Sequence, residues 1–297
     1  MNELVSIIIP TYNRESTIIR AVESVLSQTY KNIEVIIVDD CSTDGTLKLL
    51  KDNYSTNQKV RIYKLDKNSG ACAARNKGID VSQGKYIAFL DSDDVYYPKK
   101  IEWQMNVLED DKYDLCATNY DRIDHNGTNG KITVKNLNGD NLLRELLFCN
   151  FITTGTLLGK KECFQDVKFD VSLARYQDWD LVLRLCKKYN FYFLNKSSLL
   201  QEYQKSSITS STSHAKTFDA LMNIYVKNYD SFKKFSNANT QIKWLIGIHS
   251  LFINSAPKYD FLWYGVCGDG FKIKRFFIYL MARLHMYTMI DKLFIQG

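Results

Sequence analysis

The sequence lacks three features that would point to common classes of protein. No run of apolar residues approaches the roughly 20 needed to cross a bilayer. The N-terminus has no basic stretch followed by an apolar one, so no signal peptide is expected. Neither G-x-x-x-x-G-K-[ST] nor a G-x-G-x-x-G after the first predicted strand is present, which disfavours P-loop and dinucleotide-binding folds.

Cysteine pairs and strong charge are also missing. The seven cysteines are scattered and form no C-x-x-C pair, which indicates reduced thiols in a cytoplasmic protein rather than disulfides or a zinc site. The net charge is +6, from 39 basic and 33 acidic residues. This excess suits an anionic ligand or an anionic membrane surface, but it is too diffuse to indicate a nucleic-acid partner.

The first part of the chain alternates between predicted strands and predicted helices. With 45% hydrophobic and 24% charged residues, the composition is that of an ordinary globular protein. Four short apolar runs, each followed by a helical stretch, predict an α/β fold with a largely parallel sheet. The predicted strands are Leu4–Ile9, Ile33–Val38, Val60–Leu65 and Tyr86–Leu90.

A polar cluster follows each of these strands. In open sheets of this kind, ligands bind beyond the carboxyl ends of the strands, so the clusters should gather at one edge and form a site. The clusters are Pro10–Arg14, Asp39–Asp44, Asn68–Gly70 and Asp91–Asp94.

The acidic cluster after the fourth strand is the strongest single signal. Asp91 and Asp93 have one residue between them, so in an extended segment both carboxylates would point to the same side. Two hard oxygen ligands can hold Mg²⁺ or Mn²⁺ and leave positions open for phosphate oxygens. The alternative is a solvated acidic turn, or Asp94 as the cap of the next helix.

The four stretches that contain these clusters resemble the family 2 glycosyltransferases with a GT-A fold. The order and spacing match over roughly the first 105 residues, in Val5–Arg14, Glu34–Thr46, Asn68–Gly78 and Gly84–Asp94. The resemblance implies a Rossmann-like nucleotide-diphospho-sugar transferase domain, a UDP-sugar donor, Mn²⁺ or Mg²⁺ as cofactor, and inversion at the anomeric carbon.

The resemblance also assigns roles to residues of this sequence. Pro10, Thr11 and Tyr12 would lie against the nucleobase, and Asp40 would accept a hydrogen bond from a uracil N–H. Arg75 would lie near the diphosphate. Asp91 would lie near the ribose and the metal, and Asp93 would be a direct metal ligand. The remaining expected donor contacts are Arg14, Asn68, Gly70 and Ser92, whereas Asp39 is predicted to cap the turn after its strand.

The acceptor side resembles the family at Gln177-Asp-Trp-Asp-Leu181, where an acid at a helix start precedes Trp-Asp-Leu. Asp178 would then be the base that takes the proton of the acceptor hydroxyl. The alternative is that Asp178 only caps the helix. Asp180 is interpreted as structural or as an acceptor contact. Gln177 stands where the family often has Glu, which removes one negative charge.

A second departure follows Tyr203, where many relatives have a histidine that this sequence lacks. His214 is close by and is a further candidate metal ligand, although an exposed histidine is the simpler interpretation. Lys205 is a candidate diphosphate contact. The run Ser206–Ser213 is expected to close over the donor as a lid.

The last part of the chain is predicted to be a helical extension. The expected organisation is a donor-binding half of the GT-A domain at 1–105, an acceptor-binding half at 106–210 and the extension at 211–297. Phe271–Arg283 is basic and aromatic, which suits peripheral contact with an anionic membrane. The alternative is a helical cap on the core or on a second subunit of a homo-oligomer.

Together these features predict a metal-dependent, inverting hexosyl- or N-acetylhexosaminyltransferase. Its acceptor would be a glycan or a lipid-linked hydroxyl in bacterial surface polysaccharide synthesis, at the inner face of the cytoplasmic membrane. One alternative is a nucleotidyltransferase, but the first loop is not rich in glycine and arginine. Another is a catalytically silent scaffold, against which the presence of Asp91, Asp93 and Asp178 argues.

Overall fold

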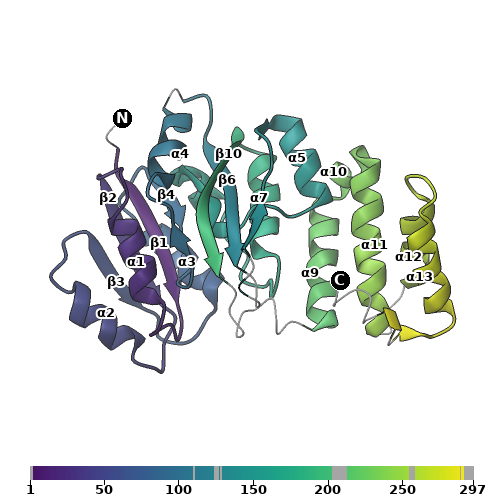
Figure 1. Ribbon diagram of the computed structural model, residues 1–297, viewed down its shortest axis with the longest axis horizontal. Helices are drawn as coiled ribbons and strands as arrows, with labels where there is room; N and C mark the ends of the chain where they lie inside the picture. Colours follow the sequence, from purple (N-terminus) through teal and green to yellow (C-terminus); the bar gives the residue numbers. More distant parts are fainter. Residues whose placement is uncertain are drawn as a thin grey trace. The chain divides into compact units, whose positions relative to one another are not determined.

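The computed structural model describes residues 3–109, 111–123, 127, 129–202, 213–253, 258–287 and 289–290. The chain divides into two compact units, whose elements are labelled in Figure 1. The first unit comprises residues 1–143, 151–172 and 177–207. The second comprises residues 144–150, 173–176 and 208–297.

The described strands form one ten-stranded mixed sheet in the first unit. Its order is β3-β2-β1-β4-β9-β6-β10-β5, with β7 paired to β6 and β8 paired to β10. The strand bounds are β1 (Val5–Thr11), β2 (Ile33–Asp39), β3 (Val60–Lys64), β4 (Tyr86–Phe89), β5 (Val95–Tyr96), β6 (Leu115–Ile123), β7 (Asn129–Ile132), β8 (Leu137–Asn138), β9 (Leu158–Lys160) and β10 (Phe191–Glu202).

The helices around this sheet follow the alternation that the sequence predicts. Their bounds are α1 (Ile18–Leu26), α2 (Thr46–Tyr54), α3 (Ala71–Val81), α4 (Lys100–Leu108), α5 (Gly139–Phe148), the 3-10 helix η1 (Thr154–Thr156), α6 (Lys161–Asp166) and α7 (Gln177–Cys186). Helix α5 begins in the first unit and ends in the second.

The first four strands are parallel, and the later ones are mixed. β1, β2 and β4 are buried along their whole length, as expected for parallel strands that are covered on both faces. β1 and β2 pair with each other, and β4 and β3 pair with them from outside, all in parallel register. β9 then runs antiparallel to both β4 and β6, and β5 runs antiparallel to β10. The parallel arrangement predicted from the first four strands is therefore confirmed, whereas the later strands pair both in parallel, as β10 with β6, and antiparallel.

Helices cover both faces of the parallel strands. Ile7 and Ile9 of β1 belong to the same apolar cluster as Val22 of α1. Ile8 points to the other face, where α3 approaches very closely. A Cβ added to Gly78 would lie 2.4 Å from Ile8 Cγ2, so only glycine allows this approach. The close packing fixes α3, and the start of α3 lies at the carboxyl edge of the sheet.

Lys100, the first residue of α4, is fully buried in this unit. Its Nζ donates to Gln104 Oε1 at 2.5 Å and lies 4.4 Å from the centroid of the Tyr96 ring. Burial lowers the pKa of Lys100 to about 7. The ammonium form is therefore poorly stabilised inside the fold, because these polar contacts replace only part of its hydration.

We expect Lys100→Met to change the pH dependence of stability. Between pH 7 and the ordinary lysine pKa of 10.5, the unfolded chain binds a proton that the folded chain does not, so Lys100 costs more stability as the pH falls. The difference in free energy of unfolding between wild type and variant should change by up to about 1.4 kcal/mol per pH unit in this window. Urea unfolding across the window measures this. The exposed neighbour Lys99, changed to Met, is the control. A Lys100→Met difference that is constant with pH would contradict the expectation.

The second unit is helical where the structure describes it. Its helices are α9 (His214–Lys227), α10 (Tyr229–Lys234), α11 (Ser236–Phe252), α12 (Lys258–Cys267) and α13 (Ile273–Arg283). A separate apolar cluster joins α11, α12 and α13 through Trp244, Leu262 and Ala282. Among the described residues, no helix is both long and apolar enough to cross a membrane.

Candidate active site

The acidic cluster after β4 forms a tight turn. The Asp94 backbone N–H donates to the Asp91 carbonyl at 3.0 Å, which closes the segment Asp91–Asp94. The segment is therefore a turn and not extended, so the reason given for Asp91 and Asp93 sharing a side does not hold. The four residues turn because β4 ends at Phe89 and the chain must reverse into β5. Ser92, an expected donor contact, is buried within the turn.

The carboxylates in this turn repel one another. Burial and the neighbouring charge of Asp91 raise the pKa of Asp93. Burial and the charges of Asp91 and Asp93 raise the pKa of Asp94 well above its usual range. Two cations partly offset this charge, since Arg14 Nε lies 3.6 Å from Asp93 Oδ2 and Arg20 donates to the Asp93 carbonyl. The turn thus carries negative charge that an added cation would stabilise.

Arg75 of α3 connects this turn with the acceptor side. Its Nη2 lies 2.5 Å from Asp91 Oδ1, and its guanidinium stacks 5.3 Å from the centroid of the Phe169 ring. Its Nε is buried and has no hydrogen-bond partner among the described residues. The charges of Asp91 and Asp178 both raise the pKa of Arg75. One buried guanidinium therefore lies within electrostatic range of both acids.

Asp178 and Asp180 have different surroundings on the first turn of α7. Asp178 is half-buried, and its Oδ1 accepts from the Trp179 backbone N–H at 2.8 Å. Asp180 is fully buried and pairs with Arg184 at 2.6 Å, and Arg184 also donates to the Lys168 carbonyl. Asp180 therefore makes a structural contact, whereas Asp178 lies within electrostatic range of Arg75.

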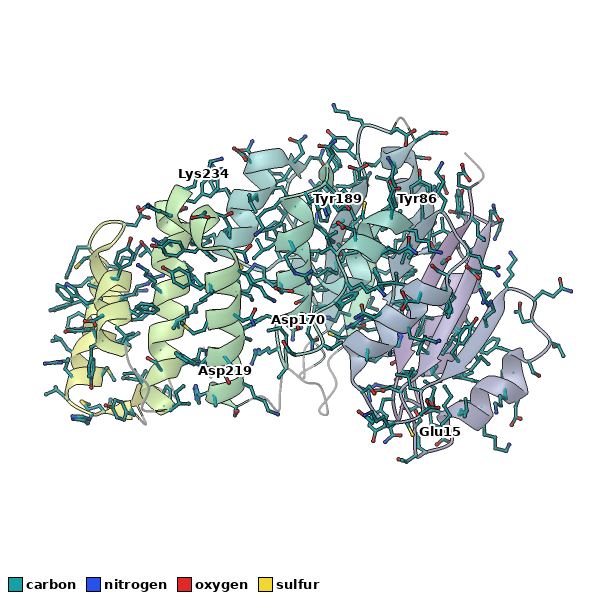
Figure 2. All side chains as sticks on the ribbon, turned by 180° about the vertical axis from the view of Figure 1, so that it is seen from behind. Glu15, Tyr86, Asp170, Tyr189, Asp219 and Lys234 are labelled. Carbon is teal, nitrogen blue, oxygen red and sulfur yellow. The ribbon has the colours of Figure 1, made fainter. Side chains whose placement is uncertain are left out.

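The end of β1 supplies the residues expected against the nucleobase. Pro10 and Thr11 belong to the strand itself, and Tyr12 follows with 40% of its surface exposed. Thr11 Oγ1 is buried without a hydrogen-bond partner among the described residues. Figure 2 labels Glu15, just beyond this strand end, and Tyr86 at the start of β4, which lie at opposite edges of the sheet. The expected donor contacts therefore lie at the carboxyl edge.

Asp39 and Asp40 at the end of β2 hold the neighbouring loops. Asp39 Oδ2 accepts from the Ser42 backbone N–H at 3.1 Å, which confirms its predicted role as a turn cap. Asp40 accepts from the backbone N–H groups of Ser69 and Gly70, both at 2.7 Å. Gly70 has a φ of +85° and immediately precedes α3, so Asp40 fixes the start of that helix. The contact of Asp40 with a uracil stays a prediction, and Asn68 is exposed beside this turn.

A pocket of about 310 Å³ lies beside Asp40, and the sequence interpretation missed most of its lining. It is lined by Cys41 after β2, by Lys64 at the end of β3, and by Leu65 and Asp66 after β3. Cys41 has a φ of +64°, a strained conformation for this residue type. The rule that identified the other candidate residues could have found these as well, because they too lie at the carboxyl ends of parallel strands.

A larger cavity of about 650 Å³ lies elsewhere in the first unit. It is lined by residues at the starts of β6 and β10, among them Tyr113, Tyr189 and Phe191, and by none of the predicted site residues. Figure 2 shows Tyr189 at the same edge as Tyr86, opposite Glu15. Size alone therefore does not identify the active site, because the acids and Arg75 lie at the other edge.

The acidic turn fits a divalent cation in its chemistry. Asp91 and Asp93 offer hard oxygen ligands, and their mutual repulsion would be relieved by a bound cation. Among the described residues, no group of three or more His, Cys, Asp or Glu side chains is arranged to hold a metal ion. Such an incomplete set is typical of Mg²⁺ or Mn²⁺ sites that substrate phosphates complete.

His214 lies in the second unit at the start of α9. Its Nδ1 is 2.9 Å from His249 Nδ1, and its ring stacks on Phe252. These contacts explain why the side chain is held in that unit, and its role as a metal ligand stays a prediction. The candidate contact Lys205 and the proposed lid up to residue 212 lie outside the described residues.

Several known proteins are similar to this chain. The family model "Glycosyl transferase family 2" matches residues 6–167. An uncharacterized glycosyltransferase of Rickettsia felis is 34% identical over 235 residues, which cover 78% of this chain and 38% of the relative. The Escherichia coli protein WfaP, named UDP-Glc:alpha-D-GlcNAc-diphosphoundecaprenol beta-1,3-glucosyltransferase, is 47% identical over 118 residues, or 40% of this chain and 46% of WfaP.

Solved structures show the same fold at low sequence identity. Residues 1–349 of Staphylococcus aureus TarS in complex with UDP superpose with a TM-score of 0.67 and 17% identity, covering 99% of this chain and 91% of that one. The chain spans only between 25% and 50% of the length of the first four curated relatives that it matches.

Proposed function

The chain belongs to the family 2 glycosyltransferases and has their GT-A fold, and on this premise we propose that it transfers a sugar from a UDP-sugar to a hydroxyl group. The transferred group is a hexosyl or N-acetylhexosaminyl residue, and the acceptor is a glycan or a lipid-linked sugar. One observation carries the proposal. Arg75 pairs with Asp91 on the donor side and lies within electrostatic range of Asp178 on the acceptor side.

The donor would bind along the carboxyl edge of β1 to β4. The pocket beside Asp40 and the exposed Tyr12 ring offer an apolar and hydrogen-bonding surface for a flat base. Arg75 would place its positive charge near the diphosphate, where charge-assisted hydrogen bonds are strong. The name of WfaP and the UDP complex of TarS support uridine as the base.

Asp91 and Asp93 would hold the divalent cation, Mn²⁺ or Mg²⁺. When bound there, the cation supplies positive charge that offsets the negative charge of the departing UDP. Arg14 lies beside Asp93 in the turn and would keep that carboxylate ionised and oriented.

Asp178 would act as the general base. It would accept the proton of the acceptor hydroxyl while the hydroxyl oxygen bonds to the anomeric carbon and the bond from that carbon to the diphosphate oxygen breaks. The electron pair of the broken bond leaves with UDP. Because attack comes from the face opposite the leaving group, the configuration at the anomeric carbon inverts.

The wider role would be the assembly of a bacterial surface polysaccharide. The name of WfaP, which describes an undecaprenol-linked acceptor, supports a lipid-linked substrate. Such an acceptor would bring the enzyme to the inner, cytoplasmic face of the membrane as a peripheral protein. A homo-oligomer remains compatible with the proposal, and binding of nucleic acid is not part of it.

A screen of nucleotide sugars tests the proposed donor. UDP release from UDP-glucose, UDP-galactose and their N-acetylated forms is measured with and without Mn²⁺, alongside thermal stabilisation by each compound. We expect metal-dependent UDP release from one of them and an upward shift of the melting temperature, because a bound ligand stabilises the folded state. Turnover of a GDP- or dTDP-sugar in preference to every UDP-sugar would refute the donor assignment, and binding without any turnover would indicate a silent relative.

A further inference from the structure

Helix α13 in the second unit is apolar on two faces. On one face, Phe276, Tyr279 and the fully buried Ala282 pack against the cluster of α11 and α12. On the other, Ile273, Phe277 and Leu280 are 56%, 58% and 39% exposed. One apolar face is enough to pack a helix on its unit, so the second needs another explanation.

The exposed side chains form a single stripe. At about 100° per residue, positions 273, 277, 280 and 284 fall within roughly 60° of one another around the helix axis. Leu284, at the C-terminal cap, is 71% exposed and extends the stripe by one turn. Phe271, just before the helix, is 59% exposed. We call Ile273, Phe277, Leu280 and Leu284 the α13 stripe.

Basic residues flank the stripe on both sides. By the same geometry Lys274 lies about 100° from Ile273 in one direction and Arg283 about 80° in the other. Both residues are exposed, and the Arg283 guanidinium lies 4.9 Å from the centroid of the Tyr259 ring while remaining at the surface. From Phe271 to Ile290 the sequence contains four Lys or Arg residues and no Asp or Glu. Arg275 points inward, where it donates to the Gly265 carbonyl and stacks over Trp244, so it does not contribute to this outer face.

We propose that the α13 stripe lies in the interface of an anionic lipid bilayer, with Lys274 and Arg283 at the level of the headgroups. Apolar side chains would enter the acyl boundary, and the long basic side chains would reach up to the phosphates. The absence of acidic residues in this segment of the sequence makes an anionic surface the matching partner. This inference goes beyond the proposed transfer reaction and does not depend on it.

Vesicle co-sedimentation of the full chain tests the inference. Binding is compared between vesicles of phosphatidylglycerol mixed with phosphatidylcholine and vesicles of phosphatidylcholine alone. We expect binding to the anionic vesicles that weakens with salt. Phe277→Ser combined with Leu284→Ser should lower the partition coefficient by at least about tenfold, because each change removes a side chain that would be buried in lipid.

Matched variants separate the stripe from exposure or charge in general. Val226→Ser on α9 removes another exposed apolar side chain, 65% exposed, and should leave the partition coefficient unchanged. Lys274→Gln should weaken binding to anionic vesicles only, and Lys234→Gln on α10 is its control. Metal-dependent UDP release in solution should be the same for all four variants, so failure of the lipid inference and failure of the proposed function are distinguishable.

Two results would overturn the inference. One is equal binding of wild type and the Phe277→Ser, Leu284→Ser variant to anionic vesicles. The other is that wild type does not bind vesicles but forms a dimer in analytical ultracentrifugation, and that this variant is monomeric. That result would assign the stripe to contact with a second copy of the chain.

Discussion

Asp178→Asn is expected to slow sugar transfer by roughly 10²–10⁴-fold, the usual contribution of a general base. The amide has nearly the same shape as the carboxylate, so donor binding should be retained. The change also removes a negative charge that acts on Arg75, which should leave that guanidinium at least as available to a diphosphate. The measurement is the rate of transfer to acceptor, together with the affinity for the UDP-sugar.

Asp180→Asn is the matched control, because it makes the same chemical change two residues away on the same helix. Asp180 is fully buried and pairs with the partly exposed Arg184, so its replacement should reduce the free energy of unfolding by about 1–3 kcal/mol. Asp178 is half-buried, and its replacement should leave the melting temperature nearly unchanged. Full transfer activity in Asp178→Asn would remove the proposed base from the mechanism.

Asp93→Asn is expected to abolish metal-dependent binding of the donor. Removing a residue that only hydrogen-bonds to a metal ligand typically weakens metal affinity by about 10–100-fold. Removing a direct ligand should therefore weaken metal affinity by more than about 100-fold. Titration of a UDP-sugar at increasing Mn²⁺ concentration measures this. Binding without metal should change little, since the nucleobase and Arg75 contacts remain.

Asp80→Asn serves as the control for that titration. Asp80 is an exposed acid at the far end of α3, paired with Lys168 at 2.6 Å. Its replacement should leave the dependence on Mn²⁺ intact. If Asp93→Asn retains the wild-type response to Mn²⁺, the cation is held elsewhere and the assignment of Asp93 is wrong.

The sequence predicts the first half of the fold well because each parallel strand has a clear signal in its own residues. A short β-branched run such as Ile33–Val38 is buried on both faces, and the polar residues that follow it mark the strand end. The second half depends on long-range pairing. β5 and β8 have two residues each and β9 has three, which is too short for any periodic signal.

The site is predictable as a set of residues but not as a geometry. The alternation rule places Asp40 and Asp91 at one edge of the sheet, and the family resemblance adds Arg75; all three lie there. The rule could not reveal that Asp91–Asp94 is a closed turn, since the sharp return into β5 arises from its pairing with β10. Nor could it reveal that Glu202, 182 residues along the chain, pairs with Arg20 beside Asp93.

The helical extension is predictable in kind, but the bounds of its helices are not. α12 has a weak periodic signal, because Tyr259, Trp263 and Tyr264 leave it no clear polar face. Its glycine has a packing reason, since a Cβ on Gly265 would lie 2.8 Å from the Trp244 side chain. The two helices are therefore close because glycine lets the indole approach, a feature that periodicity does not capture.

The two hydrogen bonds that Asp40 accepts from Ser69 and Gly70 have a consequence for mutagenesis. Arg75 lies on α3, little more than one helical turn after Ser69 and Gly70, whose backbone N–H groups donate to Asp40. A substitution that removes the Asp40 carboxylate would break both hydrogen bonds and free the start of α3. The Arg75 guanidinium would then be less firmly held near the diphosphate. Weak nucleotide binding by an Asp40 variant could then have two causes. One is the loss of the uracil contact, and the other is displacement of Arg75.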